Sequence, residues 1–150
     1  MSDNRPDPPV DPRGVRFAAA ITTVVLALVL VTDSVWLLAA QVAVFALAAF
    51  AGLRFAPYTA AFRLLVAPRI GPSTARDDAA PVRFSQAVGF FFACAGLIGY
   101  ATGVTALGIA ATALALAAAF LNAAFGFCLG CELYELIARF RTTSTKGVSA

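Results

Sequence analysis

The chain has 150 residues, of which 61% are hydrophobic and 13% are charged. Soluble domains have roughly 45–50% apolar and about 25% charged residues, so an ordinary soluble globular protein is excluded. The net charge of +3 comes from basic residues that flank the hydrophobic stretches, as membrane topology signals do, and we expect no nucleic-acid partner. The absence of histidine excludes His-dependent catalysis and removes the commonest transition-metal ligand. We expect no cofactor and no metal site.

The first fourteen residues are polar and rich in proline. Pro6, Pro8, Pro9 and Pro12 oppose a regular helix, and the segment has almost nothing apolar to bury. We therefore expect a disordered tail over residues 1–14. It lacks the short hydrophobic core and cleavage site of a signal peptide.

Hydrophobic stretches long enough to cross a ~30 Å hydrocarbon core as helices follow this tail. We expect membrane spans at about residues 15–31, 35–53, 82–101 and 104–126. The surrounding lipid bilayer is thus the first partner that the sequence predicts. The fold class that follows is an all-α membrane protein with a bundle of four transmembrane helices.

Two of the breaks between spans are very short. Asp33 and Ser34 separate the first two spans, and either side chain is able to cap the second helix. Thr102 and Gly103 separate the last two, so each pair of spans must run antiparallel. Glycines in the third span and alanines in the fourth predict close helix packing.

The connector over residues 54–81 is rich in arginine. Tyr58, Ala61, Phe62 and Leu65 recur at helical spacing between two prolines, which predicts a short helix lying in the membrane surface. An irregular loop is the alternative.

A short motif opens both odd-numbered spans. Val15-Arg16-Phe17, followed by Ala20, recurs as Val82-Arg83-Phe84, followed by Ala87. This pattern predicts two parallel helical-hairpin repeats about an axis normal to the membrane. A chance match of a few residues is the competing explanation.

The basic residues indicate the orientation of the chain. All eleven Lys and Arg residues lie in the N-terminal tail, the connector, the C-terminal segment or the span edges beside them. By the positive-inside rule, both termini and the connector are cytoplasmic, including a tail at residues 141–150. We therefore expect a multi-pass protein of the cell membrane.

Cys128 and Cys131 are the clearest chemical signal in the chain. Residues three apart on a helix face the same way, so these thiols are able to form a disulfide, to supply half of a metal site, or to act as attacking and resolving thiols. The strand that precedes this motif in thioredoxin-like folds is missing. Simple packing, as we expect for Cys94, is the alternative.

The local backbone decides how reactive these thiols are. At the end of a straight helix, the helix dipole together with Glu132 and Glu135 disfavours thiolate. A bend at Gly126 would instead start a new helix over residues 129–140 and place Cys128 at its N-terminus, where thiolate is favoured. Gly126 and Gly130 are also spaced for a close helix crossing, which is the competing use of these glycines.

Two segments resemble a known family. VDPRGVRFAAA near the start and NAAFGFCLGCELY near the end are similar to a family of prokaryotic membrane proteins catalogued as domain of unknown function 4395. The likeness covers Val10 to about Arg139. It implies a four-helix integral membrane fold and an established Cys-x-x-Cys, without a settled activity.

Two functions of different classes remain open. The first is a membrane-embedded thiol module in which Cys128 and Cys131 exchange electrons or sulfur with a soluble thioredoxin-like or rhodanese-like partner. The second is a non-catalytic membrane scaffold or interaction subunit with structural cysteines. The sequence names neither an electron acceptor nor a substrate, and it leaves homodimerisation open.

Overall fold

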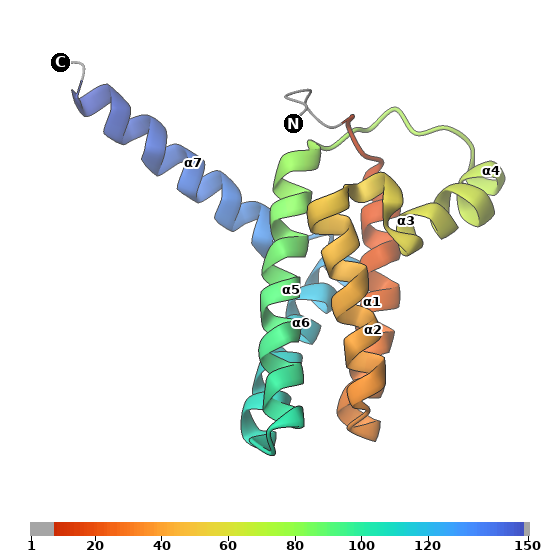
Figure 1. Cartoon of the computed structure of the whole chain (residues 1–150). Helices are drawn as coiled ribbons and strands as arrows, with labels where there is room; N and C mark the ends of the chain where they lie inside the picture. Colours follow the sequence, from red (N-terminus) through yellow and green to blue (C-terminus); the bar gives the residue numbers. More distant parts are fainter. Residues whose placement is uncertain (1–7, 149–150) are drawn as a thin grey trace.

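The structure is a computed structural model that describes residues 8–148, with side chains to residue 143. Residues 1–7 of the expected N-terminal tail and the end of the expected C-terminal tail lie outside the described residues. The described part is helical apart from turns, loops and one isolated bridge between Val10 and Asp77 (Figure 1). Its helices are α1 (Pro12–Thr32), α2 (Val35–Ala46), α3 (Pro57–Ala61), α4 (Ala67–Ile70), α5 (Ala79–Ala101), α6 (Thr105–Phe125) and α7 (Leu129–Val148), with π-helical segments at Leu47–Ala51 and Phe62–Val66 and a 3-10 turn at Leu53–Phe55.

Three of the described helices, α1, α5 and α6, are long and apolar enough to cross a membrane. Each has 21 to 23 residues, and a bilayer core needs about 20. The all-helical membrane protein expected from the sequence is therefore confirmed. The remaining apolar helix, Val35–Ala51, is shorter: α2 continues into the π-helical segment, which ends at Ala51 before Gly52 with its φ of 118°.

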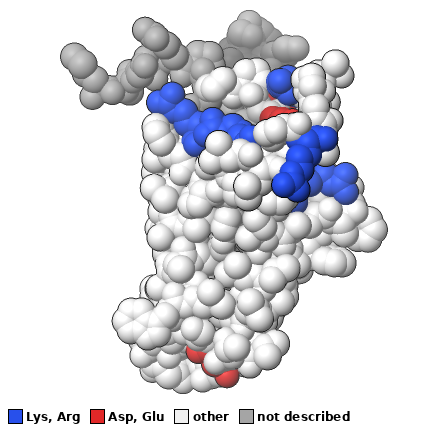
Figure 2. All heavy atoms as spheres, turned by 90° about the vertical axis from the view of Figure 1, so that its right-hand side faces the viewer, with Lys and Arg blue, Asp and Glu red and all other residues white. Residues whose placement is uncertain are grey.

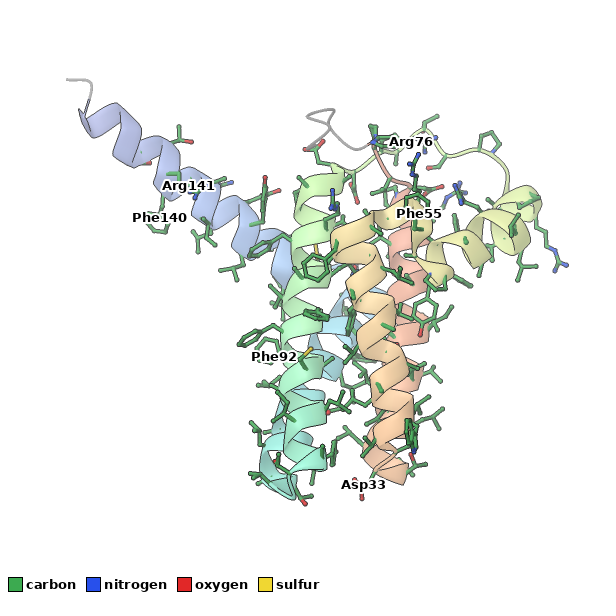
Figure 3. The ribbon with its side chains drawn as sticks, viewed as in Figure 1. Asp33, Phe55, Arg76, Phe92, Phe140 and Arg141 are labelled. Atoms are coloured by element: carbon green, nitrogen blue, oxygen red, sulfur yellow. A yellow bond between two sulfur atoms is a disulfide. The ribbon has the colours of Figure 1, made fainter. Side chains whose placement is uncertain are left out.

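The two ends of the helix bundle differ in charge. Lys and Arg side chains gather at one end (Figure 2), together with both ends of the described chain and the connector (Figures 1 and 3). Asp33 marks the other end, in the turn between α1 and α2 (Figure 3). Trp36, in the same turn region, is 86% exposed, as an aromatic side chain at a membrane interface would be.

The start of α1 corrects one sequence expectation. The expected tail included Pro12 and Gly14, but the helix already begins at Pro12. Proline is tolerated at the first helical position because its missing N–H has no helical partner there. Asp11 caps the helix by accepting from Arg13 N at 2.9 Å. The Arg13 side-chain hydrogen bond also holds the pKa of Asp11 below its usual value.

The turn before α2 and the α5–α6 hairpin confirm two other expectations. Ser34 is the capping residue of α2, since its Oγ accepts from Leu37 N at 3.2 Å. In the α5–α6 hairpin, a Cβ at Gly99 would lie 3.0 Å from Gly108 Cα, and one at Gly96 would lie 2.8 Å from Thr112 Oγ1. These glycines let the two helices approach closely.

The bundle has a continuous apolar core. α1 packs mainly against α6, and α5 lies between α2 and α6. The side chains buried where these helices meet are Leu26, Val29, Leu38, Phe45, Ala93 and Ala115.

The two copies of the Val-Arg-Phe motif make matching contacts. Arg16 of α1 donates through Nη2 to Ala123 O at 3.2 Å, at the end of α6. Arg83 of α5 donates to Ala49 O through Nε at 3.1 Å and Nη2 at 2.8 Å, near the end of the helix that begins with α2. Each arginine thus caps the second helix of the other hairpin.

The neighbouring phenylalanines also behave alike. Phe17 packs on Phe62, which belongs to the helical connector after the first hairpin, with ring centroids 5.7 Å apart. Phe84 packs on Tyr134 of α7, after the second hairpin, with the same separation of 5.7 Å. A helical arm therefore follows each hairpin, and the two arms point away from each other in Figure 1.

The connector is helical from Pro57 to Ile70, slightly beyond the helix that the sequence predicted. Tyr58 anchors it to the bundle by donating to Gln41 Oε1 at 2.7 Å. Phe62 is 3% exposed, whereas Leu64 and Leu65 are exposed. The connector thus presents one apolar face inward and leaves a second apolar face open.

Candidate functional site

The candidate site is the corner between α6 and α7. Helix α6 ends at Phe125, and Gly126 takes the left-handed conformation with φ of 68°. Its N–H donates to Asn122 O at 3.0 Å, and Phe127 N donates to Leu121 O at 3.3 Å. This pattern closes a helix C-terminus and favours glycine. The bend that the sequence allowed at Gly126 is therefore present.

Cys128 occupies the capping position of the next helix. Its carbonyl oxygen accepts from Glu132 N at 3.0 Å, and its Sγ accepts from Cys131 N at 3.2 Å. The two sulfur atoms are joined in a disulfide, with Cα atoms 5.1 Å apart. Sulfur at a helix N-terminus faces unpaired N–H groups and the positive end of the helix dipole. The bend therefore places Cys128 at the start of α7, as the sequence hypothesis of an attacking thiol required.

The two cysteines have different surroundings, although both are partly buried. Cys131 packs against an apolar cluster formed by the end of the first hairpin, the start of the connector and the start of α5. Cys128 instead lines a cavity inside the bundle. Of the two cysteines, Cys128 is the one among the residues that line this cavity.

This cavity has a volume of about 260 Å³, and α5, α6 and the first turns of α7 supply most of its walls. Ligand pockets typically measure ~300–1,000 Å³, so it is small. Its lining is mostly apolar, with a few polar side chains on α1, α5 and α6. These are Thr22, Ser85, Gln86 and Asn122.

The mouth of the cavity is apolar. Leu114, Leu129 and Leu133 belong to its lining and are 43 to 58% exposed. Phe92, which also lines the cavity, lies further along α5 toward the end of the bundle that Asp33 marks (Figure 3). Exposed leucines thus border the cavity that Cys128 also lines.

Gly130 sets how closely α7 approaches α5. A Cβ at this position would lie 2.6 Å from Ser85 Cα and closer still to Ser85 Cβ. Two heavy atoms cannot approach so closely without a shift of the backbone. The two uses that the sequence suggested for glycines here are both realised, since Gly126 forms the corner and Gly130 the close crossing.

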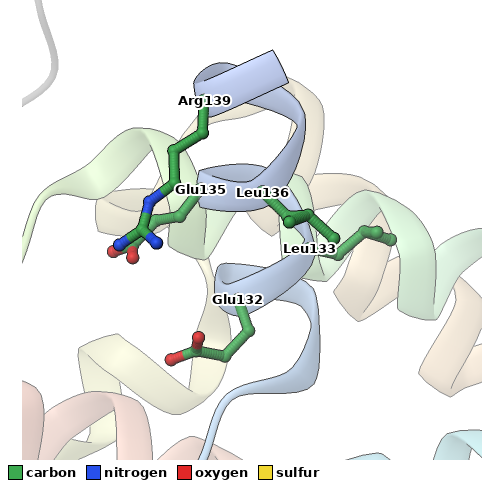
Figure 4. A pocket seen from close by; sticks show the side chains of 5 residues that line it. All are labelled: Glu132, Leu133, Glu135, Leu136 and Arg139. Carbon is green, nitrogen blue, oxygen red and sulfur yellow. The ribbon is translucent and has the colours of Figure 1, made fainter.

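Beyond its first turns, α7 is amphipathic and leaves the bundle. The side chains of Glu135 and Arg139 extend to one side of the helix, and Leu133 and Leu136 lie away from them (Figure 4). These side chains line a hollow of about 330 Å³. All of them belong to α7, so the hollow is a feature of the helix surface. The helix continues to Val148, past the end at residue 140 and into the tail that the sequence predicted.

The other candidates from the sequence lie apart from this corner. Cys94 is a free thiol in α5 with intermediate exposure. Among the described residues, no group of three or more His, Cys, Asp or Glu side chains is placed to hold a metal ion. The cavity residues Gln86 and Asn122 carried no sequence signal, because isolated amides in a span have no distinctive spacing. Arg16 did carry one, since it belongs to the repeated motif.

The fold and the site together define a helical membrane protein with a Cys-x-x-Cys pair at the break between two helices. The chain belongs to the family described as Domain of unknown function (DUF4395), which matches residues 10–139. The match includes both cysteines of the pair, and it confirms the family expected from the two sequence motifs. The searches found no match among curated proteins or solved structures.

Proposed function

We propose that the chain is a thiol module embedded in the cell membrane, which exchanges electrons or sulfur with a soluble thioredoxin-like or rhodanese-like protein. The observation that carries this proposal is the position of Cys128, which caps α7 through its sulfur within bonding reach of Cys131. A thiol that only fills space has no need of a helix N-terminus.

The membrane arrangement of this proposal has four spans in two parallel hairpin repeats, with both termini in the cytoplasm. Support comes from the basic end of the bundle and from the matching contacts of Arg16 and Arg83. Helix Val35–Ala51 is the fourth span, with 17 residues near the lower limit of about 17 for crossing. Cysteines introduced next to Asp33 and Thr102 should react only with reagents outside the cell. Reaction from the cytoplasm at either turn would refute this topology.

The two arms complete the arrangement. Helix α7 exposes Leu129, Leu133, Leu136 and Phe140 along one face, and the connector exposes Leu64. Apolar faces at the basic end of a membrane bundle fit the interface between lipid tails and head groups. In this arrangement the cysteine pair lies close to the cytoplasmic boundary, within reach of a soluble protein.

Electron exchange uses both thiols. The Cys128 thiolate attacks the disulfide of the partner, whose S–S bond breaks as a mixed disulfide forms and one partner thiolate leaves. Cys131, once deprotonated, then attacks Cys128 Sγ and releases the second partner thiolate. The partner gains two electrons, and the pair becomes a disulfide.

Sulfur exchange uses Cys128 first. Its thiolate attacks the terminal sulfur of a partner persulfide, the partner thiolate leaves, and the sulfur atom stays on Cys128 as a new persulfide. Both routes need one exposed thiolate and run in either direction. They differ in whether Cys131 then becomes oxidised.

Mass spectrometry of thiols alkylated in freshly lysed cells tests the proposal. We expect a measurable fraction of disulfide or persulfide at Cys128 and Cys131, and a mixed disulfide with a soluble protein in a Cys131→Ser variant. Cys94 is the internal control, because this free thiol in α5 should stay reduced. If all three thiols are uniformly reduced and the pair is unreactive, the cysteines are structural and the chain is a membrane scaffold.

A further inference from the structure

We propose that Arg16 is the positioning residue for Cys128, since it holds the corner between α6 and α7 and adds positive charge at that corner, two residues before Cys128. This inference rests on the proposed thiol function, because it names a residue that acts on that reaction through Cys128. Arg83 supplies the comparison, because it caps the corresponding helix end in the other half of the molecule.

The first basis is the contact itself. Arg16 lies near the start of α1, yet its Nη2 reaches Ala123 O at 3.2 Å and Ala124 O at 3.4 Å. These carbonyls belong to the last turn of α6, where backbone acceptors lack helical donors. A residue more than a hundred positions away in the sequence therefore holds the end of the helix that leads to the cysteines.

The second basis is where the side chain runs. A Cβ at Gly126 would lie 3.9 Å from both Cδ and Nε of Arg16, so the guanidinium group lies alongside the corner residue. Gly126 is two residues before Cys128, and its left-handed backbone sets the direction in which the chain leaves α6. Holding this corner therefore fixes where the Cys128 sulfur lies relative to the first turn of α7.

The third basis is electrostatic. The C-terminal end of α6 is the negative pole of its dipole and disfavours a nearby thiolate, as Glu132 does from the first turn of α7. Helix α6 has no charged residue of its own. From α5, Arg83 is bound to carbonyls of the first hairpin. Arg16 is therefore placed to offset both negative influences and to favour the Cys128 thiolate.

Arg83 makes this inference testable. Its contacts with Ala49 O, at 3.1 and 2.8 Å, are shorter than those of Arg16 with α6, at 3.2 and 3.4 Å, so its loss also uncaps one helix end. The corner that follows leads to Ala56, which caps α3 and has no thiol. Because Ala56 belongs to the cluster packed against Cys131, the comparison is made at Cys128 in a chain that lacks Cys131. Damage to the bundle alone should therefore appear equally in Arg16 and Arg83 variants, whereas an effect on thiol chemistry should appear only with Arg16.

The first measurement is the pH dependence of Cys128 alkylation in the full chain with Cys94→Ser and Cys131→Ser. Arg16→Gln keeps hydrogen-bond donors but loses the charge, Arg16→Lys keeps the charge, and Arg83→Gln is the matched control. We expect Arg16→Gln to move the midpoint to higher pH and to slow alkylation near neutral pH roughly two- to fivefold. We expect Arg16→Lys to keep the midpoint near that of the parent and Arg83→Gln to leave it unchanged.

The second measurement uses the chain with all three cysteines. It follows the rate at which a reduced thioredoxin exchanges with the Cys128–Cys131 disulfide. The same ranking of rates is expected, with Arg16→Gln slowest. The inference about Arg16 would be overturned if Arg16→Gln left the pH profile of Cys128 alkylation unchanged, or if Arg83→Gln shifted it equally. Exchange by the parent chain would still support the proposed function in that case. Failure of the parent chain to exchange, with the pH shift intact, would refute electron exchange as its function and keep the role of Arg16 in positioning Cys128.

Discussion

The two halves of the molecule share a framework but differ in chemistry. In each half an arginine caps the second helix of the opposite hairpin, and a phenylalanine packs on a ring in the helical arm that follows its own hairpin. The caps of the two arms also correspond, since Ala60 N donates to Ala56 O and Glu132 N donates to Cys128 O, both at 3.0 Å.

The difference appears at these capping positions. Counted back from Phe62 and Tyr134, the positions of Cys128 and Cys131 correspond to Ala56 and Thr59. The first arm is fixed by Tyr58, which bonds Gln41, and the second arm is fixed by Gly130, which lies against Ser85. One half therefore uses the corner for attachment alone, and the other half places two sulfur atoms there.

The largest effect is expected from a substitution that breaks the attachment of the second arm, α7, to α5. Gly130→Ala puts a methyl group too close to Ser85 Cα, at 2.6 Å, and this clash should destabilise the docking of α7 by about 1–3 kcal/mol. We expect faster proteolysis within α7 and faster reduction of the disulfide, measured by limited digestion and thiol titration. Glu135→Ala, on an exposed part of the same helix, should leave both rates unchanged. Equal rates in the two variants would show that the close crossing does not hold α7.

The corresponding change in the first arm should affect stability only. Gln41 is 1% exposed, and its Oε1 loses a hydrogen bond in Tyr58→Phe. An unpartnered buried group costs about 1–3 kcal/mol, so the melting temperature should fall. Thiol titration should match that of the parent chain, because Tyr58 bonds Gln41 of α2, whereas the connector residue in the cluster packed against Cys131 is Ala56. A changed rate of disulfide reduction would mean that the two arms are coupled.

The ring contacts provide a finer comparison. Aromatic pairs contribute about 0.5–1.5 kcal/mol beyond buried area, and both pairs have ring centroids 5.7 Å apart. Phe17→Leu and Phe84→Leu should lower thermal stability by similar amounts, as thermal scans in detergent can measure. Only Phe84→Leu should also speed reduction of the disulfide, since its partner Tyr134 lies on α7. The same acceleration in both variants would contradict this assignment.

The smallest expected effect lies within the cysteine pair. Cys128 caps α7, whereas Cys131 lies one turn in, beside Glu132. Helix-end electrostatics of about 0.3–1 kcal/mol correspond to roughly two- to fivefold in thiolate population. Cys128 in Cys131→Ser should therefore alkylate faster near neutral pH than Cys131 in Cys128→Ser. Equal rates, or a slower Cys128, would remove the attacking role from Cys128.

A substitution at the corner sharpens this last comparison. Gly126 has φ of 68°, a backbone conformation that residues with a side chain such as leucine rarely adopt. Gly126→Leu should favour a continuous helix through the motif and reduce the difference between the two thiols. Gly71, which also has positive φ and lies in the connector, gives the matched control Gly71→Leu.

Much of the fold was accessible from the sequence because a membrane span leaves a strong local signal. The three long spans, the Ser34 cap and the helical connector all follow from runs of apolar residues and from their polar breaks. The helix start at Pro12 was wrongly placed, because a proline that breaks a helix interior is acceptable at its first position. The extent of α7 was also underestimated, since its last turns carry polar residues that give no apolar periodicity.

The candidate site divides in the same way. The sequence by itself determined the cysteine spacing and the family, and it limited the backbone at Gly126 to two alternatives, a straight or a bent helix, because these depend on neighbouring residues. The tertiary structure decided that the helix bends there, that Cys128 faces a cavity while Cys131 packs on apolar side chains, and that Arg16 holds the corner. Those contacts join α1, α5 and α6 to α7 across distant parts of the chain, and only the packing of the hairpins brings them together.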